Sequence, residues 1–264
     1  RGRSVGPLCF GDYEVQETLS RQGGVADYLA HNILLEREEP VRLRVFSYDP
    51  YLEEDALLHR REIIRREAKS LQEIGAHPNL ITLQGFFTAP NDPNLFVEVT
   101  EWSEEGTLRE LMRANEQISL EQALELVQEV AAGIKVVHDT GVIHRDIRPE
   151  NVLIGRDGRP RLMNFDHARL PLPGVRTVSP IQHDPDVSRA YLAPELLANS
   201  PCPATDIYGL GMIWFEMLVG DTPYDSPEQA LQAGTISAGP KGYIDEDIPA
   251  RLNDLVCRMI SLDP

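Results

Sequence analysis

The sequence of 264 residues has few cysteines and no long hydrophobic run. Its three cysteines, Cys9, Cys202 and Cys257, are too few and too scattered for a disulfide framework or a zinc site. They fit a reducing compartment, so we expect a cytoplasmic protein. The longest apolar stretch, residues 210–219, contains Glu216 and falls well short of the roughly 20 residues that cross a bilayer. We therefore expect no membrane segment.

Positive charge, and lysine above all, is also scarce. The 25 basic and 42 acidic side chains give a net charge of −17. This charge argues against nucleic acid as a partner, because affinity for a phosphate backbone depends on counterion release by many basic groups. The lysines are Lys69, Lys135 and Lys241, so the first 68 residues contain none. Chemistry that needs a lysine in this region would have to use arginine.

The first hundred residues predict a small antiparallel sheet with one helix. A charged helix is expected over residues 53–74, where apolar residues recur at helical spacing. Clusters of β-forming residues, separated by Gly, Pro and Asn, predict five strands at residues 13–19, 27–33, 41–46, 80–87 and 95–100.

The rest of the chain is predicted to be mainly helical. Ser119 and Gln122 form a capping-box pattern that starts a long helix ending near His138. The apolar residues 207–219 predict a buried core helix. Residues 170–187 are rich in proline and poor in structural signals, which suggests a functional or a disordered loop.

One motif suggests a family. The sequence His144-Arg145-Asp146-Ile147-Arg148-Pro149-Glu150-Asn151 lies between the long helix and a predicted hairpin, and it resembles the catalytic loop of eukaryotic-type protein kinases. Further matches follow in the expected order. Ala193-Pro194-Glu195 resembles the end of the activation segment, and Asp206 with Gly209-Leu210-Gly211 resembles the start of the buried helix after it. Residues 95–108 resemble the fifth strand and the hinge.

The resemblance covers roughly residues 12–264 and implies an α+β, two-lobed protein-kinase-like fold. Residues 12–103 would form a small lobe with five antiparallel strands and one helix. Residues 104–264 would form a larger, mainly helical lobe whose last helices are absent, as in a domain cut from a longer protein. The arginine-rich usage suggests a bacterial source, and the general appearance is similar to the large multidomain kinases of bacterial phage-defence systems.

The resemblance also implies roles for individual residues. In the family, an aspartate accepts or orients the proton of the attacking hydroxyl, a nearby cation neutralises the phosphoryl group, and an asparagine reaches a metal. Asp146, Arg148 and Asn151 occupy these places. The alternative for Asp146 is that it only stabilises its own loop. The gatekeeper would be Thr100, and the hinge would contain Glu101 and Trp102.

The positions that would bind a nucleotide depart from the family pattern. Ser20, Gln22 and Val25 stand where the family has the three glycines of its phosphate-binding hairpin, and Asp27 replaces the valine that covers the base. A carboxylate there would face a triphosphate or its apolar lid. An ordinary hairpin with a turn at Gly23-Gly24 is the better interpretation.

The third strand departs as well. Arg44 replaces the phosphate-binding lysine, and Arg42 takes the place of the small alanine against the adenine. Strand alternation puts both arginines on one face of the sheet, where Arg42 should fill part of the base pocket. Glu67 lies on the apolar stripe of its helix and is expected to pair with Arg44; an exposed pair with a neighbouring arginine is the alternative.

The metal-binding positions are also altered. The family has Asp-Phe-Gly, whose aspartate chelates magnesium, whereas this sequence has Asn164-Phe165-Asp166. An amide oxygen is a weaker ligand for Mg²⁺ than a carboxylate. Asn151, Asn164 and Asp166 are therefore the candidate metal ligands, and Phe165 is expected to keep only a packing role.

These departures favour a pseudokinase that regulates or scaffolds other domains of the same polypeptide or a protein partner, with no cofactor expected. The first alternative is an atypical Ser/Thr protein kinase that uses ATP with Mg²⁺ or Mn²⁺. The second is a small-molecule phosphotransferase. It ranks last because such enzymes usually lack the Ala-Pro-Glu motif and the long activation segment that are present here.

Overall fold

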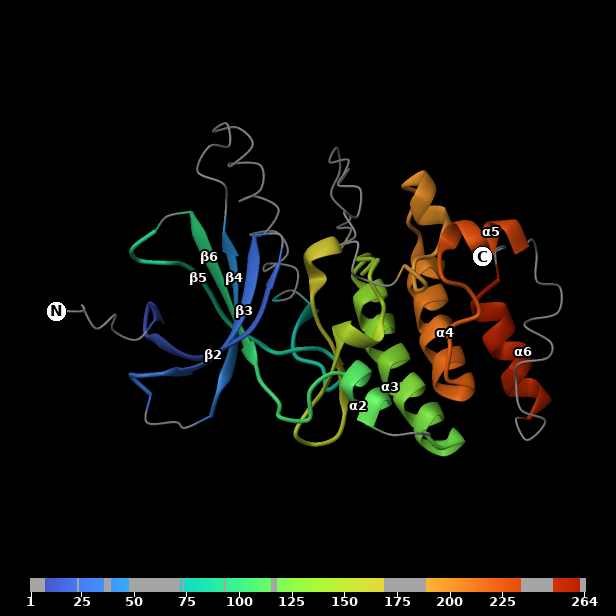
Figure 1. The fold of residues 1–264 in the computed structure, drawn as a ribbon, viewed down its shortest axis with the longest axis horizontal. Coiled ribbons are helices and arrows are strands. Elements are labelled where there is room, and N and C mark those ends of the chain that lie inside the picture. The colour runs from blue at the N-terminus through green and yellow to red at the C-terminus, as the bar shows by residue number, and fades with distance from the viewer. Residues whose placement is uncertain are drawn as a thin grey trace. The chain divides into compact units, whose positions relative to one another are not determined.

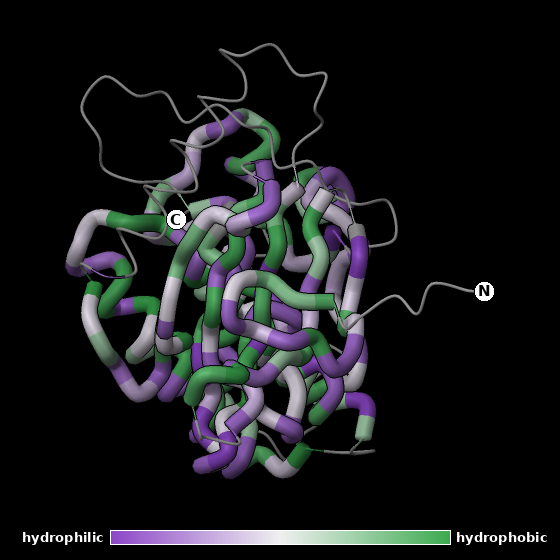
Figure 2. Tube along the Cα trace, turned by 90° about the vertical axis from the view of Figure 1, so that its left-hand side faces the viewer, coloured by the Kyte–Doolittle hydropathy of each residue, from purple (hydrophilic) through white to green (hydrophobic). Residues whose placement is uncertain are grey.

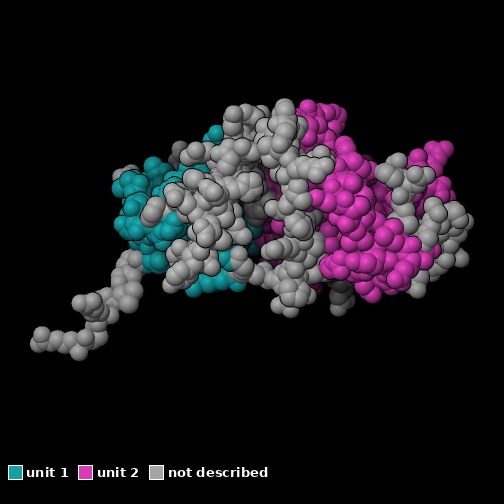
Figure 3. Space-filling model, turned by 90° about the horizontal axis from the view of Figure 1, so that it is seen from above, with its two compact units in different colours: residues 1–76, 81–104 teal, residues 77–80, 105–264 magenta. Residues whose placement is uncertain are grey.

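The chain divides into two compact units (Figure 3), each described by itself. Unit 1 contains residues 1–76 and 81–104, and unit 2 contains residues 77–80 and 105–264. The computed structural model describes residues 8–22, 24–35, 39–47, 72, 74–92, 94–114, 118–168, 189–233 and 249–261. The predicted helix at 53–74, apart from residues 72 and 74, and the predicted loop at 170–187 lie outside these described residues.

Unit 1 is an antiparallel sheet with the strand order β1-β2-β3-β4-β6-β5 (Figure 1). Its strands are β1 (Cys9–Phe10), β2 (Tyr13–Gln22), β3 (Val25–Asn32), β4 (Val41–Ser47), β5 (Leu83–Thr88) and β6 (Leu95–Glu101). The prediction of five strands was wrong by one, because β1 has only two residues and shows no alternation. The strand predicted to start at residue 80 starts at Leu83, and Leu80 instead forms an isolated bridge with Leu162.

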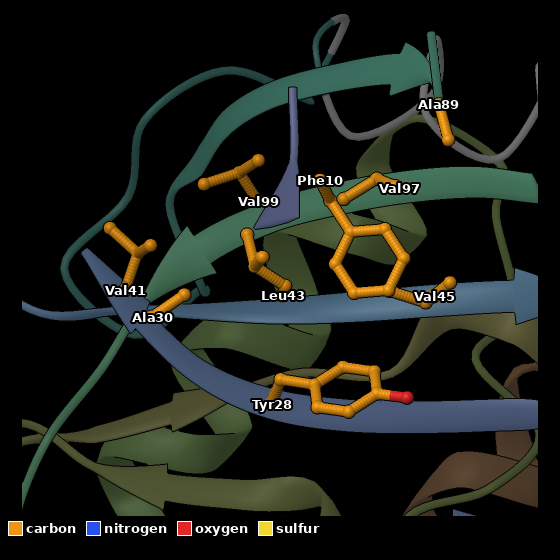
Figure 4. Packing of buried hydrophobic residues seen from close by; sticks show 9 residues of the cluster. All are labelled: Phe10, Tyr28, Ala30, Val41, Leu43, Val45, Ala89, Val97 and Val99. Atoms are coloured by element: carbon orange, nitrogen blue, oxygen red, sulfur yellow. The ribbon is translucent and has the colours of Figure 1, made fainter. Parts of the chain in front are cut away.

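Alternation along β3, β4 and β6 gives this sheet one apolar and one mixed face. The apolar face carries a buried cluster in which side chains from neighbouring strands point toward one another (Figure 4). The cluster consists of Phe10, Tyr28, Ala30, Val41, Leu43, Val45, Ala89, Val97 and Val99. The intervening residues of β3 and β4, including Asp27, Arg42 and Arg44, therefore lie on the other face.

The β2–β3 hairpin reverses where the sequence predicts it, since Gln22 pairs with Val25. Gly24 has φ +83°, and its carbonyl oxygen accepts hydrogen bonds from Ser47 N at 2.7 Å and Ser47 Oγ at 2.9 Å. A Cβ atom on Gly24 would lie 3.0 Å from the Ser47 carbonyl oxygen, so this position favours glycine.

The described part of unit 2 is mainly helical and contains one small hairpin (Figure 1). Its α-helices are α2 (Leu108–Ala114), α3 (Leu120–Asp139), α4 (Pro203–Val219), α5 (Pro227–Ala233) and α6 (Ala250–Met259). The 3-10 turns are η1 (Pro149–Asn151), η2 (Phe165–His167) and η3 (Pro194–Ala198), and the hairpin is β7 (Val152–Ile154) with β8 (Pro160–Leu162). The capping box at Ser119 and Gln122 is confirmed at the start of α3.

The buried helix α4 is the centre of unit 2 and confirms the helix predicted at residues 207–219. It packs against α3 and α6, and Trp214 and Phe215 are each only 1% exposed. Gly209 allows a close approach, because a Cβ atom there would lie 2.6 Å from the Ile147 carbonyl oxygen. The helix thus supports the loop that contains the kinase-like motif.

Hydrophobic and hydrophilic residues follow one another at short intervals along the described chain (Figure 2). Among the described helices, none is both long enough and apolar enough to cross a membrane.

Candidate functional site

On the mixed face of unit 1, a carboxylate lies between two arginines. Arg42 Nη2 donates a hydrogen bond to Asp27 Oδ2 at 2.9 Å, and Arg44 Nε lies 4.0 Å from Asp27 Oδ1. Strand register explains the arrangement, because Asp27 is directly opposite Arg44 and Arg42 is the next residue on the same face. Ser20, on the other side of Asp27, donates to Oδ2 at 3.1 Å. We call Asp27, Arg42 and Arg44 the arginine–aspartate cluster.

This cluster is largely buried, and the Asp27 carboxylate compensates one of its two positive charges. The side chains of all three residues are between 11% and 14% exposed. Burial alone would raise the pKa of Asp27, but the charges of Arg42 and Arg44 and the hydrogen bonds from Arg42 and Ser20 hold its pKa below the ordinary value. The carboxylate therefore stays ionised and fixes Arg42 within the sheet face.

The other candidate residues of unit 1 do not belong to the arginine–aspartate cluster. Thr100 lies opposite Arg42 and is 2% exposed, and its Oγ1 has no hydrogen-bond partner among the described residues. The Glu101 carboxylate accepts a hydrogen bond from Thr82 N at 3.0 Å, and Trp102 is half-buried. Glu67 lies outside the described residues, so its pairing with Arg44 stays a prediction.

In unit 2, one buried carboxylate fixes the catalytic-loop motif. Asp206, in the first turn of α4, accepts hydrogen bonds from the backbone N–H of His144 at 2.9 Å and of Arg145 at 2.7 Å. His138 Nε2 at the end of α3 donates to the same carboxylate at 2.7 Å. These contacts hold Arg145 in a left-handed conformation, φ +71°. Two core helices thus determine the path of the loop.

His144 supports the same loop from within the core. Its Nδ1 accepts the backbone N–H of Asp146 at 3.3 Å, so its Nε2 carries the proton and donates to the Met163 carbonyl at 3.0 Å. Complete burial lowers the pKa of His144, which keeps the ring neutral. The Phe165 ring packs against it edge to face at 4.6 Å, in agreement with the predicted packing role.

Three of the predicted catalytic and metal-binding residues form a hydrogen-bonded chain. Asn151 Nδ2 donates to the Asp146 carbonyl at 2.8 Å and to Asp146 Oδ2 at 2.6 Å. Asn164 Nδ2 in turn donates to Asn151 Oδ1 at 2.8 Å. Asp146 and Asn151 are therefore in contact, as a catalytic loop requires, and their contact also holds the loop together.

These residues do not fit the magnesium ion that the family pattern implies. The Asn151 oxygen that would coordinate a cation already accepts the amide proton of Asn164, and Asn164 supplies no charge. Within the described part of the chain, no group of three His, Cys, Asp or Glu residues could hold a metal ion. The side chain of Asp166 lies outside the described residues, so its proposed role stays a prediction.

Arg148 belongs to a larger charged network. Its Nε donates to Glu150 Oε2 at 3.1 Å, and Arg109 Nε donates to Glu150 Oε1 at 2.8 Å. Arg109 Nη1 also donates to Glu216 Oε1 at 2.7 Å, and the hydroxyl of Tyr191 contacts both Arg109 and Glu216. Burial would raise the pKa of Glu150, but Arg148 and Arg109 together lower it.

The sequence analysis did not identify Arg109, Tyr191 or Glu216 as members of this network. Arg109 is separated from Glu150 by 41 residues and from Glu216 by 107 residues, so no local pattern connects them. The one available signal was Glu216 itself, which interrupts the apolar stretch of a helix otherwise buried along most of its length. A buried carboxylate of this kind needs a cation.

Comparison with known proteins gives relatives over nearly the whole chain. The chain is 28% identical to the serine/threonine-protein kinase PrkC of Bacillus subtilis, over 98% of the chain and 39% of the relative. It is 28% identical to the serine/threonine-protein kinase PknB of Mycolicibacterium smegmatis, over 96% of the chain and 40% of the relative. Aurora kinase C of Mus musculus is 26% identical over 97% of the chain and 87% of the relative.

The chain thus spans about two-fifths of the length of these two bacterial relatives. The family model for the protein kinase domain matches residues 50–264. This range contains the loop that Asp206 anchors and the buried helix α4. With the sheet of unit 1 and the helices of unit 2, it shows that the chain belongs to the protein kinase family.

Proposed function

We propose that this chain is a pseudokinase, a protein-kinase-like domain with a degraded nucleotide site. It regulates or scaffolds other domains of its own polypeptide or a protein partner, and it does not transfer phosphate. The observation that carries the proposal is the arginine–aspartate cluster of unit 1. By the family pattern, Arg44 stands at the phosphate-binding lysine, Arg42 at the alanine beside the adenine, and Asp27 at the valine that covers the base.

The cluster opposes nucleotide binding in two ways. The Asp27 carboxylate pairs with both arginines and so reduces the positive charge that they could offer to a triphosphate, and Arg42 is held within the sheet face by a 2.9 Å ion pair. A nucleotide that displaced Arg42 would break this ion pair and leave Asp27 with Arg44 and Ser20 alone, which should cost about 1–2 kcal/mol. This penalty corresponds to roughly a tenfold loss of affinity.

A second candidate function is an atypical Ser/Thr protein kinase. The observation that favours it is the direct contact between Asp146 and Asn151, which family members use in phosphoryl transfer. The names of the bacterial relatives also describe Ser/Thr kinases. If this protein were active, it would use ATP with Mg²⁺ or Mn²⁺.

Calorimetric titration with ATP, with and without Mg²⁺ or Mn²⁺, separates the two functions. We expect no heat of binding from the wild type and measurable binding from Arg42→Ala with Arg44→Lys. Adding Asp27→Val should strengthen it further, since the carboxylate that competes for the cation at position 44 is removed. The same changes at exposed positions of unit 2, Arg113→Ala with Arg156→Lys, serve as the control and should leave ATP binding absent.

Clear ATP binding by the wild type would refute the proposal. Transfer of phosphate to a generic protein substrate, abolished by Asp146→Asn, would then establish the kinase. The double variant keeps the complete catalytic loop, so any gain of binding is attributable to the sheet face of unit 1.

A further inference from the structure

The direction of the hydrogen bond between Asn164 and Asn151 is fixed by the neighbouring Asp146. The Asp146 carboxylate can only accept hydrogen bonds, so the Asn151 side chain must turn its amide nitrogen toward it. The Asn151 oxygen then points away from Asp146, and the group that meets it at 2.8 Å must be a donor. Asn164 meets this requirement through its amide nitrogen, whereas an ionised aspartate at position 164 would present a second acceptor.

Two acceptors that face each other need a cation or a proton between them, whereas a donor and an acceptor form a hydrogen bond without any further group. We propose that the Asn164 amide closes the metal position of this loop, so that the chain from Asp146 through Asn151 to Asn164 is satisfied without a divalent cation. We further infer that the single substitution Asn164→Asp converts the loop into a divalent-cation site. This inference concerns unit 2 alone and does not depend on whether unit 1 binds a nucleotide.

The backbone at this position permits the test. Asn164 has φ +64°, in the left-handed region that asparagine and aspartate both tolerate. The change from Asn to Asp therefore alters charge and hydrogen bonding with little change in shape or strain. Asn199 gives a matched control: it is also left-handed, with φ +51°, but it is exposed and lies at the end of η3.

The test uses MnCl₂ alone, without nucleotide. Thermal unfolding is measured in EDTA and at increasing Mn²⁺, and free Mn²⁺ is measured by electron paramagnetic resonance. We expect no saturable response from the wild type. Asn164→Asp should melt at a lower temperature in EDTA, recover as Mn²⁺ is added, and bind Mn²⁺ at least about tenfold more tightly than the wild type. Asn199→Asp should resemble the wild type in both media.

Asn164→Ala completes the design, because it removes the donor without adding an acceptor. It should lower the melting temperature in both media, without recovery in Mn²⁺. Saturable stabilisation of the wild type by Mn²⁺ would overturn the inference, and so would an Asn164→Asp protein that folds but does not respond.

A measurement on the wild type covers the case in which Asn164→Asp does not fold. If the position is closed, sub-millimolar Mn²⁺ leaves the side-chain NH₂ signals of Asn151 and Asn164 sharp in a ¹⁵N-correlated spectrum. Selective broadening of these signals would overturn the inference. None of these measurements contains ATP, so their failure is distinguishable from a failure of the pseudokinase proposal.

Discussion

Asp27 in unit 1 and Asp206 in unit 2 are both buried carboxylates, but they bind different partners. Asp27 binds two arginine side chains across neighbouring strands. Asp206 binds the backbone N–H groups of His144 and Arg145 and the ring of His138. The first carboxylate fixes side chains, whereas the second fixes the path of the main chain.

The two carboxylates therefore depend to different degrees on the identity of the side chains around them. Backbone contacts do not depend on which side chains the loop presents, so Asp206 can hold the loop at residues 144–151 without requiring particular side chains in it. In the arginine–aspartate cluster, by contrast, a change in any one of the three side chains removes an ion pair of another. We therefore expect substitutions of Asp206 and of Asp27 to lower the free energy of unfolding by different amounts.

The largest effect is expected at Asp206. Substitution by alanine leaves two buried backbone N–H groups and the His138 ring without an acceptor, which should lower the free energy of unfolding by about 3–5 kcal/mol. Urea unfolding followed by circular dichroism measures the change. The exposed Asp254 of α6 provides the control, and Asp254→Ala should change stability by less than about 0.5 kcal/mol. A loss below about 1 kcal/mol at Asp206 would contradict its anchoring role.

A smaller loss is expected at Arg109, which joins α2 to the loop and to α4. Arg109→Met keeps most of the side-chain packing but leaves Glu150 and Glu216 without their shared cation, so stability should fall by about 2–3 kcal/mol. The pKa of Glu150 should rise because one of its two arginine partners is lost, and carboxyl NMR titration measures this rise.

Arg113 lies on the same helix and is exposed, so Arg113→Met is the matched control. It should change neither the stability nor the pKa of Glu150 measurably. An unchanged Glu150 pKa in Arg109→Met would show that Arg148 alone determines the charge of this carboxyl. The comparison between Asp27 and Asp206 would then be weakened, because the charge state of Glu150 in the loop would not depend on Arg109.

Much of the fold could be predicted from local patterns. The alternation of β4 predicted that Arg42 and Arg44 share a face, and the capping pattern at Ser119 predicted the start of α3. Both features depend on residues close in the sequence. The strand β1 was missed because two residues carry no periodic signal.

The site was less predictable, because its decisive contacts depend on register and on packing. The pairing of Arg42 with Asp27 follows from how β3 is aligned with β4, and the sequence analysis did not predict this pair. The hydrogen bond from Asn164 to Asn151 depends on the orientation of two amides. The substitutions were visible in the sequence, but the partners that compensate them were not.

The smallest effect is expected at Asp27, where the pH dependence is the sharper measurement. Asp27→Asn keeps the shape of the side chain but removes its charge, and it should lower stability at about pH 7 by about 1–2 kcal/mol. The folded pKa of Asp27 lies below its ordinary value of 3.8, so its contribution is fully present above that value. The contribution is lost as the pH falls through the folded pKa. The stability difference between wild type and variant should therefore be constant down to about pH 4 and shrink below it.

The exposed Asp12 is the control, and Asp12→Asn should leave the pH profile of stability nearly unchanged. If the difference between wild type and Asp27→Asn instead grew as the pH fell, the folded pKa of Asp27 would lie above its ordinary value. Burial would then dominate over the two arginines, and the carboxyl would be neutral when folded near that pH. Arg42 would then lose the charge that holds it in the sheet face.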